Sequence, residues 1–298
     1  MDDNNKIPDS EIVPTTSNID EEIALWEARL AEKEKEASEL SIQIQDIKNA
    51  LSVFLGEYNS RVGLLYVELD KLKMQIKEYQ RRIDLARGKK LSWEDLESIE
   101  EEVDETFSQE RQKIDDLENE ASESSEEYRR HLEAEEKRHP LSPEFQQQLK
   151  TLFRKLALKF HPDKAKNDQQ RKEFHEIFAA INEAYKNDDI ETLKKYMEQA
   201  EREEKIAKET PEEKLVRLKE EYKTLLGIIA KLQEELKSLK ASETYELKER
   251  VDQAKKDDRD LLQELADDIK AEMAENQTIL DELIAEYKRV IGGVSNYQ

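Results

Sequence analysis

The stretch Phe160-His161-Pro162-Asp163-Lys164 separates two segments whose apolar residues recur with the period of a helix. Proline has no backbone N–H to donate, and it disfavours the helical conformation of the residue before it. We therefore expect one helix to end here and another to begin a few residues later. His161, Pro162 and Asp163 are then expected at the exposed tip of a helical hairpin.

The segment before this stretch has the signals of an amphipathic helix. Ser142 is a good N-cap, Pro143 suits the first helical position, and Glu144 lies where the helix dipole favours an anion. Apolar residues then recur at steps of three and four, which predicts one apolar face. The residues of that face are Phe145, Leu149, Leu152, Leu156 and Phe160.

The opposite face of this expected helix is basic, with Lys150, Arg154, Lys155 and Lys159. Residues 141–200 contain eleven Lys or Arg and ten Asp or Glu, a net charge of +1, whereas the whole chain carries −23. A solvated surface face is one explanation. Because charge complementarity steers association, a positive face in so acidic a chain indicates an acidic partner surface.

A second amphipathic helix is expected after the stretch, with Asn167 or Asp168 as its N-cap. Its apolar face contains Phe174, Ile177, Phe178, Ile181, Ala184 and Tyr185. Two amphipathic helices joined by a short loop form an antiparallel helical hairpin.

This hairpin resembles a J domain, the module that defines the DnaJ co-chaperone family. The resemblance covers Ser142 to Lys186, and it rests on the His-Pro-Asp tripeptide, the basic helix before it and the pattern Phe-x-x-Ile-Asn-Glu-Ala-Tyr that begins at Phe178. It implies binding to a DnaK-type chaperone (heat shock protein 70) and stimulation of its ATP hydrolysis. By the same resemblance, the partner-binding residues are His161, Pro162, Asp163, Arg154, Lys155 and Lys159, with Lys150 and Lys164 as additions.

The sequence departs from the family pattern on both sides of the hairpin. The usual short first helix with a Tyr-Tyr-x-x-Leu-Gly signature is absent, and residues 188–197 replace the usual last helix. The hairpin therefore lacks part of its normal cover. We expect the replacement helix, or one of the long helices that flank the hairpin, to shield Phe153 and Leu158.

The composition favours long helices over a large globular core. Of the 298 residues, 41% are charged, against roughly 25% in ordinary globular domains. So few apolar residues can fill the narrow seams of coiled coils. The predicted fold is all-α, with long coiled-coil helices flanking a small J-domain-like hairpin.

The same composition excludes several classes of protein. The chain has no cysteine, no apolar stretch of membrane-spanning length and no apolar signal region. We therefore expect a cytoplasmic protein with no membrane segment. The net charge of −23 argues against nucleic acid as a partner.

Prolines and periodicity divide the chain into segments. From Ala121 to Arg138 the sequence is almost wholly polar, which fits either a solvated single helix or partial disorder. The expected segments are a disordered tail over 1–18, an N-terminal coiled coil over 19–87, a polar helical region over 92–138, the J-domain-like module over 141–200 and a C-terminal coiled coil over 212–291.

Both coiled-coil segments contain irregularities. The steps of four and three in the first segment are interrupted between Tyr58 and Val62, near Gly56 and Gly63. In the second, Asp258 is expected to place a charge at a seam position. The two segments pair either antiparallel within one chain or with their twins in a homodimer, and we favour pairing within the chain.

Two functions are compatible with these features. The first is a J-domain co-chaperone whose coiled coils position it or select client proteins. The second is a structural coiled-coil scaffold with an inactive J-like hairpin. We expect no enzyme, cofactor or metal site, because the sequence shows no Gly-rich phosphate loop, nucleophile motif or metal-ligand spacing.

Overall fold

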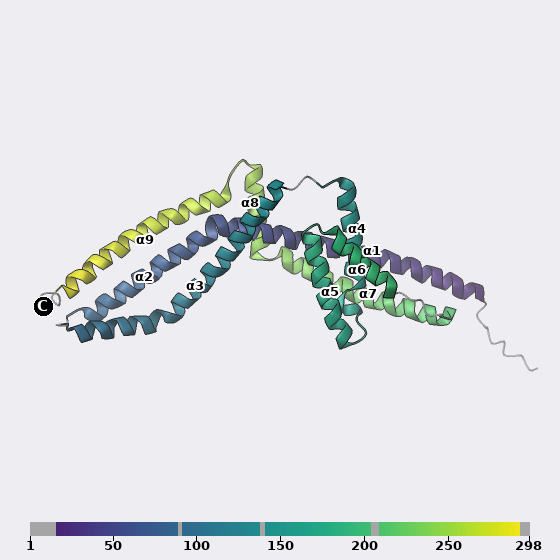
Figure 1. Cartoon of the computed structure of the whole chain (residues 1–298), viewed down its shortest axis with the longest axis horizontal. Helices are drawn as coiled ribbons and strands as arrows, with labels where there is room; N and C mark the ends of the chain where they lie inside the picture. Colours follow the sequence, from purple (N-terminus) through teal and green to yellow (C-terminus); the bar gives the residue numbers. More distant parts are fainter. Residues whose placement is uncertain (1–15, 89–90, 138–140, 204–208, 293–298) are drawn as a thin grey trace, which may run out of the picture. The chain divides into compact units, whose positions relative to one another are not determined.

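The fold is all-α, as predicted, and within the described residues it contains no strand (Figure 1). Contacts divide the chain into two compact units. Unit 1 comprises residues 1–49 and 140–241, and unit 2 comprises residues 50–139 and 242–298. The computed structural model describes residues 16–88, 91–137, 141–203 and 209–292. The tail expected over residues 1–18 lies mostly outside them.

Unit 1 contains the hairpin and two long helices. The N-cap predictions are confirmed: the Ser142 hydroxyl accepts from the Phe145 backbone N–H at 3.2 Å, and the Asn167 side chain accepts from that of Gln170 at 2.9 Å. Its elements are α1 (Thr16–Tyr58, up to Asn49), α4 (Pro143–Lys159), the short 3₁₀-helix η2 (Pro162–Lys164), α5 (Asp168–Lys186), α6 (Ile190–Glu203) and α7 (Pro211–Lys240).

Helices α1 and α7 pack side by side and run parallel. Ion pairs join Glu22 to Lys219 at 2.8 Å and Lys48 to Glu235 at 2.7 Å, so the residue numbers of the partners rise together. The antiparallel expectation was therefore wrong for this pair, although the helices do pair within one chain. The coiled-coil character of the pair stays a prediction. The buried residues of the seam between α1 and α7 are Ala37, Ile44, Leu225, Ile228, Ile229 and Leu232.

The hairpin core receives its missing cover from two sources. The Phe153 ring is 1% exposed and stacks on the Tyr185 ring, with 4.3 Å between centroids. Leu193 of α6 and Ile42 of α1 belong to the same buried cluster. Leu158 instead joins the seam between α1 and α7. The expectation that the last helix or a long flanking helix shields Phe153 and Leu158 is confirmed.

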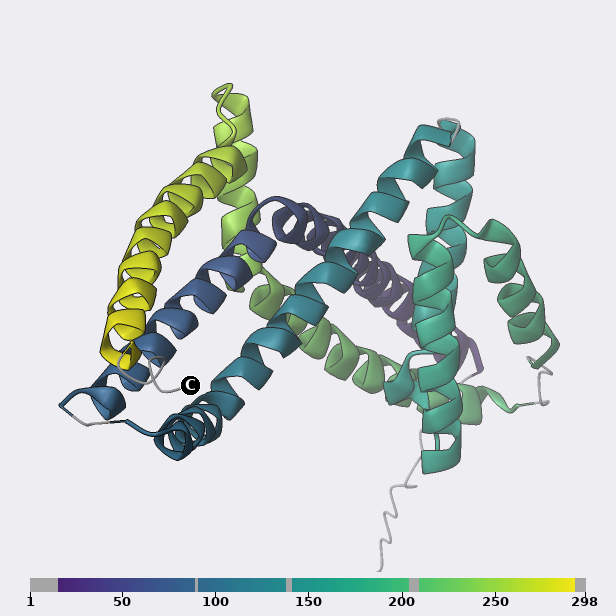
Figure 2. The ribbon, with the colours of Figure 1, turned by 60° about the vertical axis from the view of Figure 1, so that its left-hand side comes forward.

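Unit 2 is built around α2, which lies between α9 and α3 (Figures 1 and 2). Ion pairs join Lys73 to Glu272 and Arg87 to Glu286, so α9 runs parallel to α2. Besides residues 50–58 of α1, its elements are the π-helix η1 (Asn59–Gly63), α2 (Leu64–Ala86), α3 (Trp93–Lys137), α8 (Glu243–Lys256) and α9 (Leu261–Ile291).

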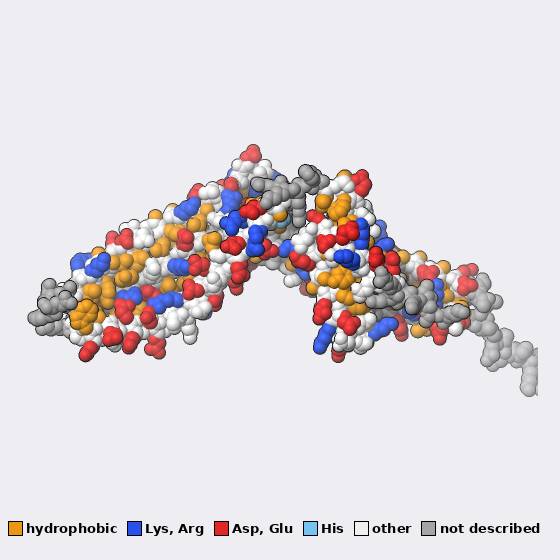
Figure 3. All heavy atoms as spheres, in the orientation of Figure 1, with side chains coloured by type: hydrophobic (Ala, Val, Ile, Leu, Met, Phe, Trp, Pro, Cys, Tyr) orange, Lys and Arg blue, Asp and Glu red, His pale blue; other side chains and the backbone are white. Residues whose placement is uncertain are grey.

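Helix α3 supplies the antiparallel neighbour of α2. Ion pairs join Lys71 to Glu118 and Lys77 to Glu110, so the partner numbers fall as α2 advances. Figure 3 shows a band of hydrophobic side chains along unit 2, between charged side chains of both signs. Helix α3 has 45 residues and continues to Lys137, so the polar segment is helical and not disordered up to that residue. It buries Ile99, Val103, Ile114 and Ala121.

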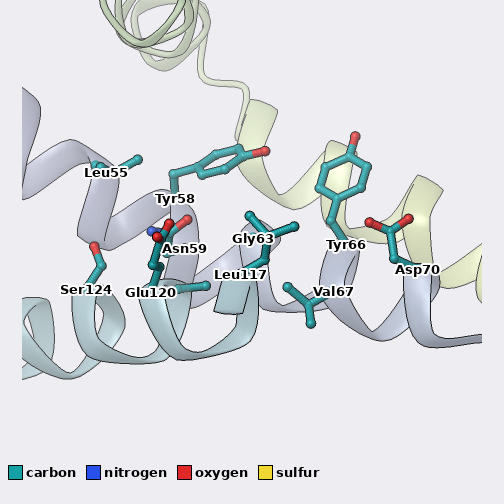
Figure 4. Close-up of a pocket in the computed structure, with 11 residues that line it drawn as sticks. Leu55, Tyr58, Asn59, Gly63, Tyr66, Val67, Asp70, Leu117, Glu120 and Ser124 are labelled. Atoms are coloured by element: carbon teal, nitrogen blue, oxygen red, sulfur yellow. The ribbon is translucent and has the colours of Figure 1, made fainter. Parts of the chain in front are cut away.

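The register interruption predicted near Val62 is confirmed as the π-helix η1. Here α1 and α3 approach closely: a Cβ on Gly56 would lie 2.5 Å from the Tyr128 Cβ. Single π-turns insert one extra residue per turn and are frequent at functional sites. Beside η1 lies an open hollow of about 490 Å³ (Figure 4). Its lining includes Leu55, Tyr58, Tyr66, Val67 and Leu117.

The second long segment is interrupted by two breaks. Ser242 caps α8 by accepting from the Tyr245 N–H at 3.3 Å. Asp258 has a φ of +53° and lies in the turn after α8, so its assignment to a seam position was wrong. Asp tolerates the left-handed conformation because its short polar side chain can hydrogen-bond locally. At Asp258, the charged residue that interrupts the apolar period thus marks a turn.

Candidate partner-binding site

The tripeptide forms a defined turn at the end of α4. The Phe160 N–H donates to the Leu156 carbonyl at 2.9 Å, and the Phe160 side chain is 1% exposed. His161 then leaves the helix with an extended backbone, and its Nδ1 accepts from the Asp163 N–H at 3.2 Å. A neutral imidazole that accepts at Nδ1 carries its proton on Nε2. Pro162 fills the first position of η2, where no N–H is needed.

The tip of the hairpin is not fully exposed, contrary to the sequence-based expectation. All four residues 161–164 are half-buried, because η2 lies against both α5 and α7. The Lys231 Nζ donates to the Asp163 Oδ2 at 2.7 Å. The Asp163 side chain is 30% exposed and that of Lys231 is 69% exposed. The tripeptide carboxylate therefore already has a cationic partner within its own unit.

Burial lowers the pKa of the His161 imidazole. The carboxylates of Asp163 and Glu235 oppose this effect, whereas the ammonium groups of Lys164 and Lys231 add to it. Desolvation disfavours the charged form, so His161 is held neutral to a lower pH than a free histidine.

Lys164 lies beside both long helices of unit 1. Burial lowers the pKa of its ammonium group, and the nearby carboxylates of Glu34 on α1 and Glu221 on α7 oppose that shift. The cation after the tripeptide is thus placed among acids of the same unit, as the carboxylate of Asp163 is placed beside a lysine.

Some basic side chains of α4 contact neighbouring helices, and others face solvent. Lys150 pairs with Asp46 of α1 at 3.7 Å, and the Lys159 Nζ donates to the Ala200 carbonyl of α6 at 2.6 Å. Arg154 is half-buried. Its Nε is buried without a hydrogen-bond partner among the described residues. Lys155 is exposed.

Two residues outside the hairpin complete this arrangement, and sequence reasoning missed both. Asp46 accepts from the Tyr185 hydroxyl at 2.8 Å as well as pairing with Lys150. Burial and this hydrogen bond raise the pKa of Tyr185. Lys231 is the second missed residue. It lies 68 positions from Asp163 in the chain, and no local pattern connects them.

Helix α1 carries a stripe of buried, uncharged residues around Ile42, the residue of α1 that belongs to the hairpin core. Ser38, Ser41, Ile42 and Gln45 follow each other at helical spacing and are all buried. The Ser41 hydroxyl donates to the Ala37 carbonyl of its own helix, which satisfies it without a partner elsewhere. An uncharged stripe in a chain that is 41% charged marks a covered face, even though most of its members are polar.

Residues 142–188 match the family model described as the DnaJ domain. The chain carries a DnaJ domain. All eight residues predicted to bind a partner lie inside the match, whereas Asp46 and Lys231 lie outside it. Searches of the curated proteins and of the solved structures gave no match.

The DnaJ domain implies a heat shock protein 70 co-chaperone type of function and a DnaK-type partner. None of the described helices is long and apolar enough to cross a membrane. Among the described residues, no group of three or more His, Asp or Glu side chains could hold a metal ion.

Proposed function

We propose that the DnaJ domain of this chain binds a DnaK-type chaperone and stimulates its ATP hydrolysis. The observation that supports this most directly is the turn at residues 161–163. It is built by an imidazole cap and a proline at the first helical position, on a fully packed hairpin. An inactive remnant has no need of this arrangement in a loop that contributes no buried side chain.

The remaining helices act in this proposal as positioning elements without catalysis of their own. Helix α1 mounts the DnaJ domain through Ile42 and Asp46, and unit 2 supplies further helical surface for client proteins or other partners. The protein is then a cytoplasmic co-chaperone and not an enzyme. Pairing within each unit already covers the long apolar seams, so a homodimer is not needed for that purpose.

The proposal is tested by the ATP turnover of a DnaK-type chaperone with and without this protein. We expect stimulation by the wild type and its loss in His161→Gln. The matched control is His175→Gln, because His175 is exposed on α5 and takes no part in the turn. Stimulation that survives in His161→Gln, with unchanged helicity in all three proteins, contradicts the proposal.

The second candidate is a structural scaffold whose hairpin is inactive. The observation that favours it is the Lys231–Asp163 ion pair, which occupies the carboxylate that a partner would use. The absence of stimulation by the wild type and by variants that release Asp163, measured with the cognate chaperone, would support the scaffold.

A further inference from the structure

We propose that α7 holds the tripeptide closed in the resting protein, and that a DnaK-type partner must displace Lys231 to reach Asp163. This inference rests on the proposed function and concerns the regulation of the same site. It makes α7 an intramolecular competitor for the partner.

The contacts of α7 converge on the tip of the hairpin. Lys231 pairs with Asp163 at 2.7 Å, and Glu221 lies close enough to Lys164 to oppose the effect of its burial. On α4, the helix before the tip, Leu158 is 9% exposed and belongs to the seam between α1 and α7. The carboxylate, the following cation and an apolar side chain of α4 therefore all meet the same pair of helices.

The orientation of α4 shows what this closure covers. Lys150, Arg154 and Leu158 are spaced by four residues and therefore share one face of the helix. Lys150 pairs with α1 and Leu158 packs between α1 and α7, so this face is turned toward the two long helices. Lys155 lies on a different face and is exposed. A partner can therefore contact Lys155 directly, whereas Arg154 is half-buried beside the long helices.

The ion pair between α7 and the tip is weaker than the apolar contacts that pack the domain against the long helices. The domain buries Ile42 of α1 in its own core cluster, whereas Lys231 remains 69% exposed while it pairs with Asp163. Exposed ion pairs contribute little and are screened by salt. We therefore expect the contact between Lys231 and Asp163 to break while the domain stays packed against α1.

The first experiment measures stimulation of ATP turnover by Lys231→Glu, which replaces the ion pair with repulsion from Asp163. If the open form is the minor form, its population sets the apparent affinity. We expect the half-maximal concentration to fall by about fivefold, the equivalent of about 1 kcal/mol. The matched control is Lys237→Glu, which makes the same charge change on α7 at a side chain that is 78% exposed and pairs only weakly, with Glu234 at 3.9 Å.

Equal half-maximal concentrations for wild type and Lys231→Glu overturn the inference but leave the proposed function intact. An equal gain in Lys237→Glu also overturns it, because long-range charge would then explain the effect.

The second experiment measures the closure without a partner. The chain has no cysteine, so spin labels can be placed at Lys172→Cys on α5 and Lys223→Cys on α7, both exposed. We expect one narrow distance distribution, which becomes broader and longer when Lys231→Glu is added. An unchanged distribution overturns the closure. If no variant stimulates the chaperone yet the distribution broadens, the proposed function fails and the closure stands.

Discussion

At the scale of single residues, the His161 imidazole both caps the turn and packs against α5. Its Nδ1 accepts the hydrogen bond that starts η2, and its ring lies near the Phe178 ring, with 6.0 Å between centroids. Protonation of Nδ1 removes the acceptor, and burial already opposes the charged form. The turn therefore depends on a neutral imidazole.

We predict that the stability of unit 1 falls as the pH is lowered from about 7.5 to about 5.5. The pKa of His161 is lower in the folded than in the unfolded protein, so below the unfolded value of about 6.5 the unfolded chain binds more protons. The contribution of His161 to the free energy of unfolding is therefore complete above the unfolded pKa, and it is lost as the pH falls through the folded pKa. Melting temperatures should show a shallower decline in His161→Gln than in wild type. Identical slopes would contradict this assignment.

Lys155 yields a second prediction at this scale. It is a cation of α4 that is exposed to solvent, so we expect Lys155→Glu to weaken binding of a DnaK-type chaperone by about fivefold at low salt. The control is Lys172→Glu, an equal charge change at an exposed site on α5. Titration at low and high salt measures both variants. Equal losses in the two would assign the effect to net charge.

Some residues of the site can be predicted from their sequence neighbours, and others cannot. The caps Ser142 and Asn167 and the tripeptide were predictable, because each acts on neighbours within a few positions. The pairing of Tyr185 with Asp46 joins residues 139 positions apart, and no local rule specifies it. The contact between Lys231 and Asp163 is of this second kind, and it adds cover at the tip that the sequence did not predict.

At the scale of elements, the period of a seam identifies its face but not the direction of its partner. The four- and three-residue steps correctly predicted the seam of α1, yet α7 runs parallel to it. Near the start of α7, Lys214 pairs with Glu27, so the chain has returned to the N-terminal part of α1 before α7 begins. The helices that lie between them in the sequence determine this direction.

Replacement of two helical glycines by alanine is expected to change stability in opposite directions. A Cβ on Gly56 would lie 2.5 Å from the Tyr128 Cβ and 3.1 Å from the Ser124 carbonyl oxygen, neither of which is a flexible side-chain end. Gly56→Ala should therefore destabilise unit 2 by about 1–3 kcal/mol. Gly227 of α7 has open space around it, so Gly227→Ala should stabilise unit 1 by roughly 0.5–1 kcal/mol. Urea unfolding measures both, and a stabilising Gly56→Ala would contradict the close approach of α1 and α3.

At the scale of the whole molecule, the DnaJ domain is completed by helices from distant parts of the sequence. Ile42 lies in its core cluster, and Leu158 needs α1 and α7 as cover. The composition predicted an all-α chain with long helices. It did not predict that α1 buries Ser38, Ser41 and Gln45 near Ile42, since polar residues are normally assigned to solvent.

We predict that the isolated fragment 141–203 is much less stable than the same residues in the full chain. Removing α1 and α7 exposes Leu158 and leaves the site of Ile42 empty, and burial of each such side chain contributes roughly 1.5–3 kcal/mol. Circular dichroism should show a broad, low-temperature transition for the fragment. A cooperative melt at the temperature of the full chain would contradict the role of the long helices.

The most direct measurement is the single-turnover rate of ATP hydrolysis by the cognate DnaK-type chaperone at a limiting concentration of this protein. Four proteins are compared: wild type, His161→Gln, Lys231→Glu and the double variant. The account predicts that Lys231→Glu stimulates more than wild type, and that neither protein with His161→Gln stimulates. Equal stimulation by Lys231→Glu and the double variant, or no stimulation by any of the four, would contradict it.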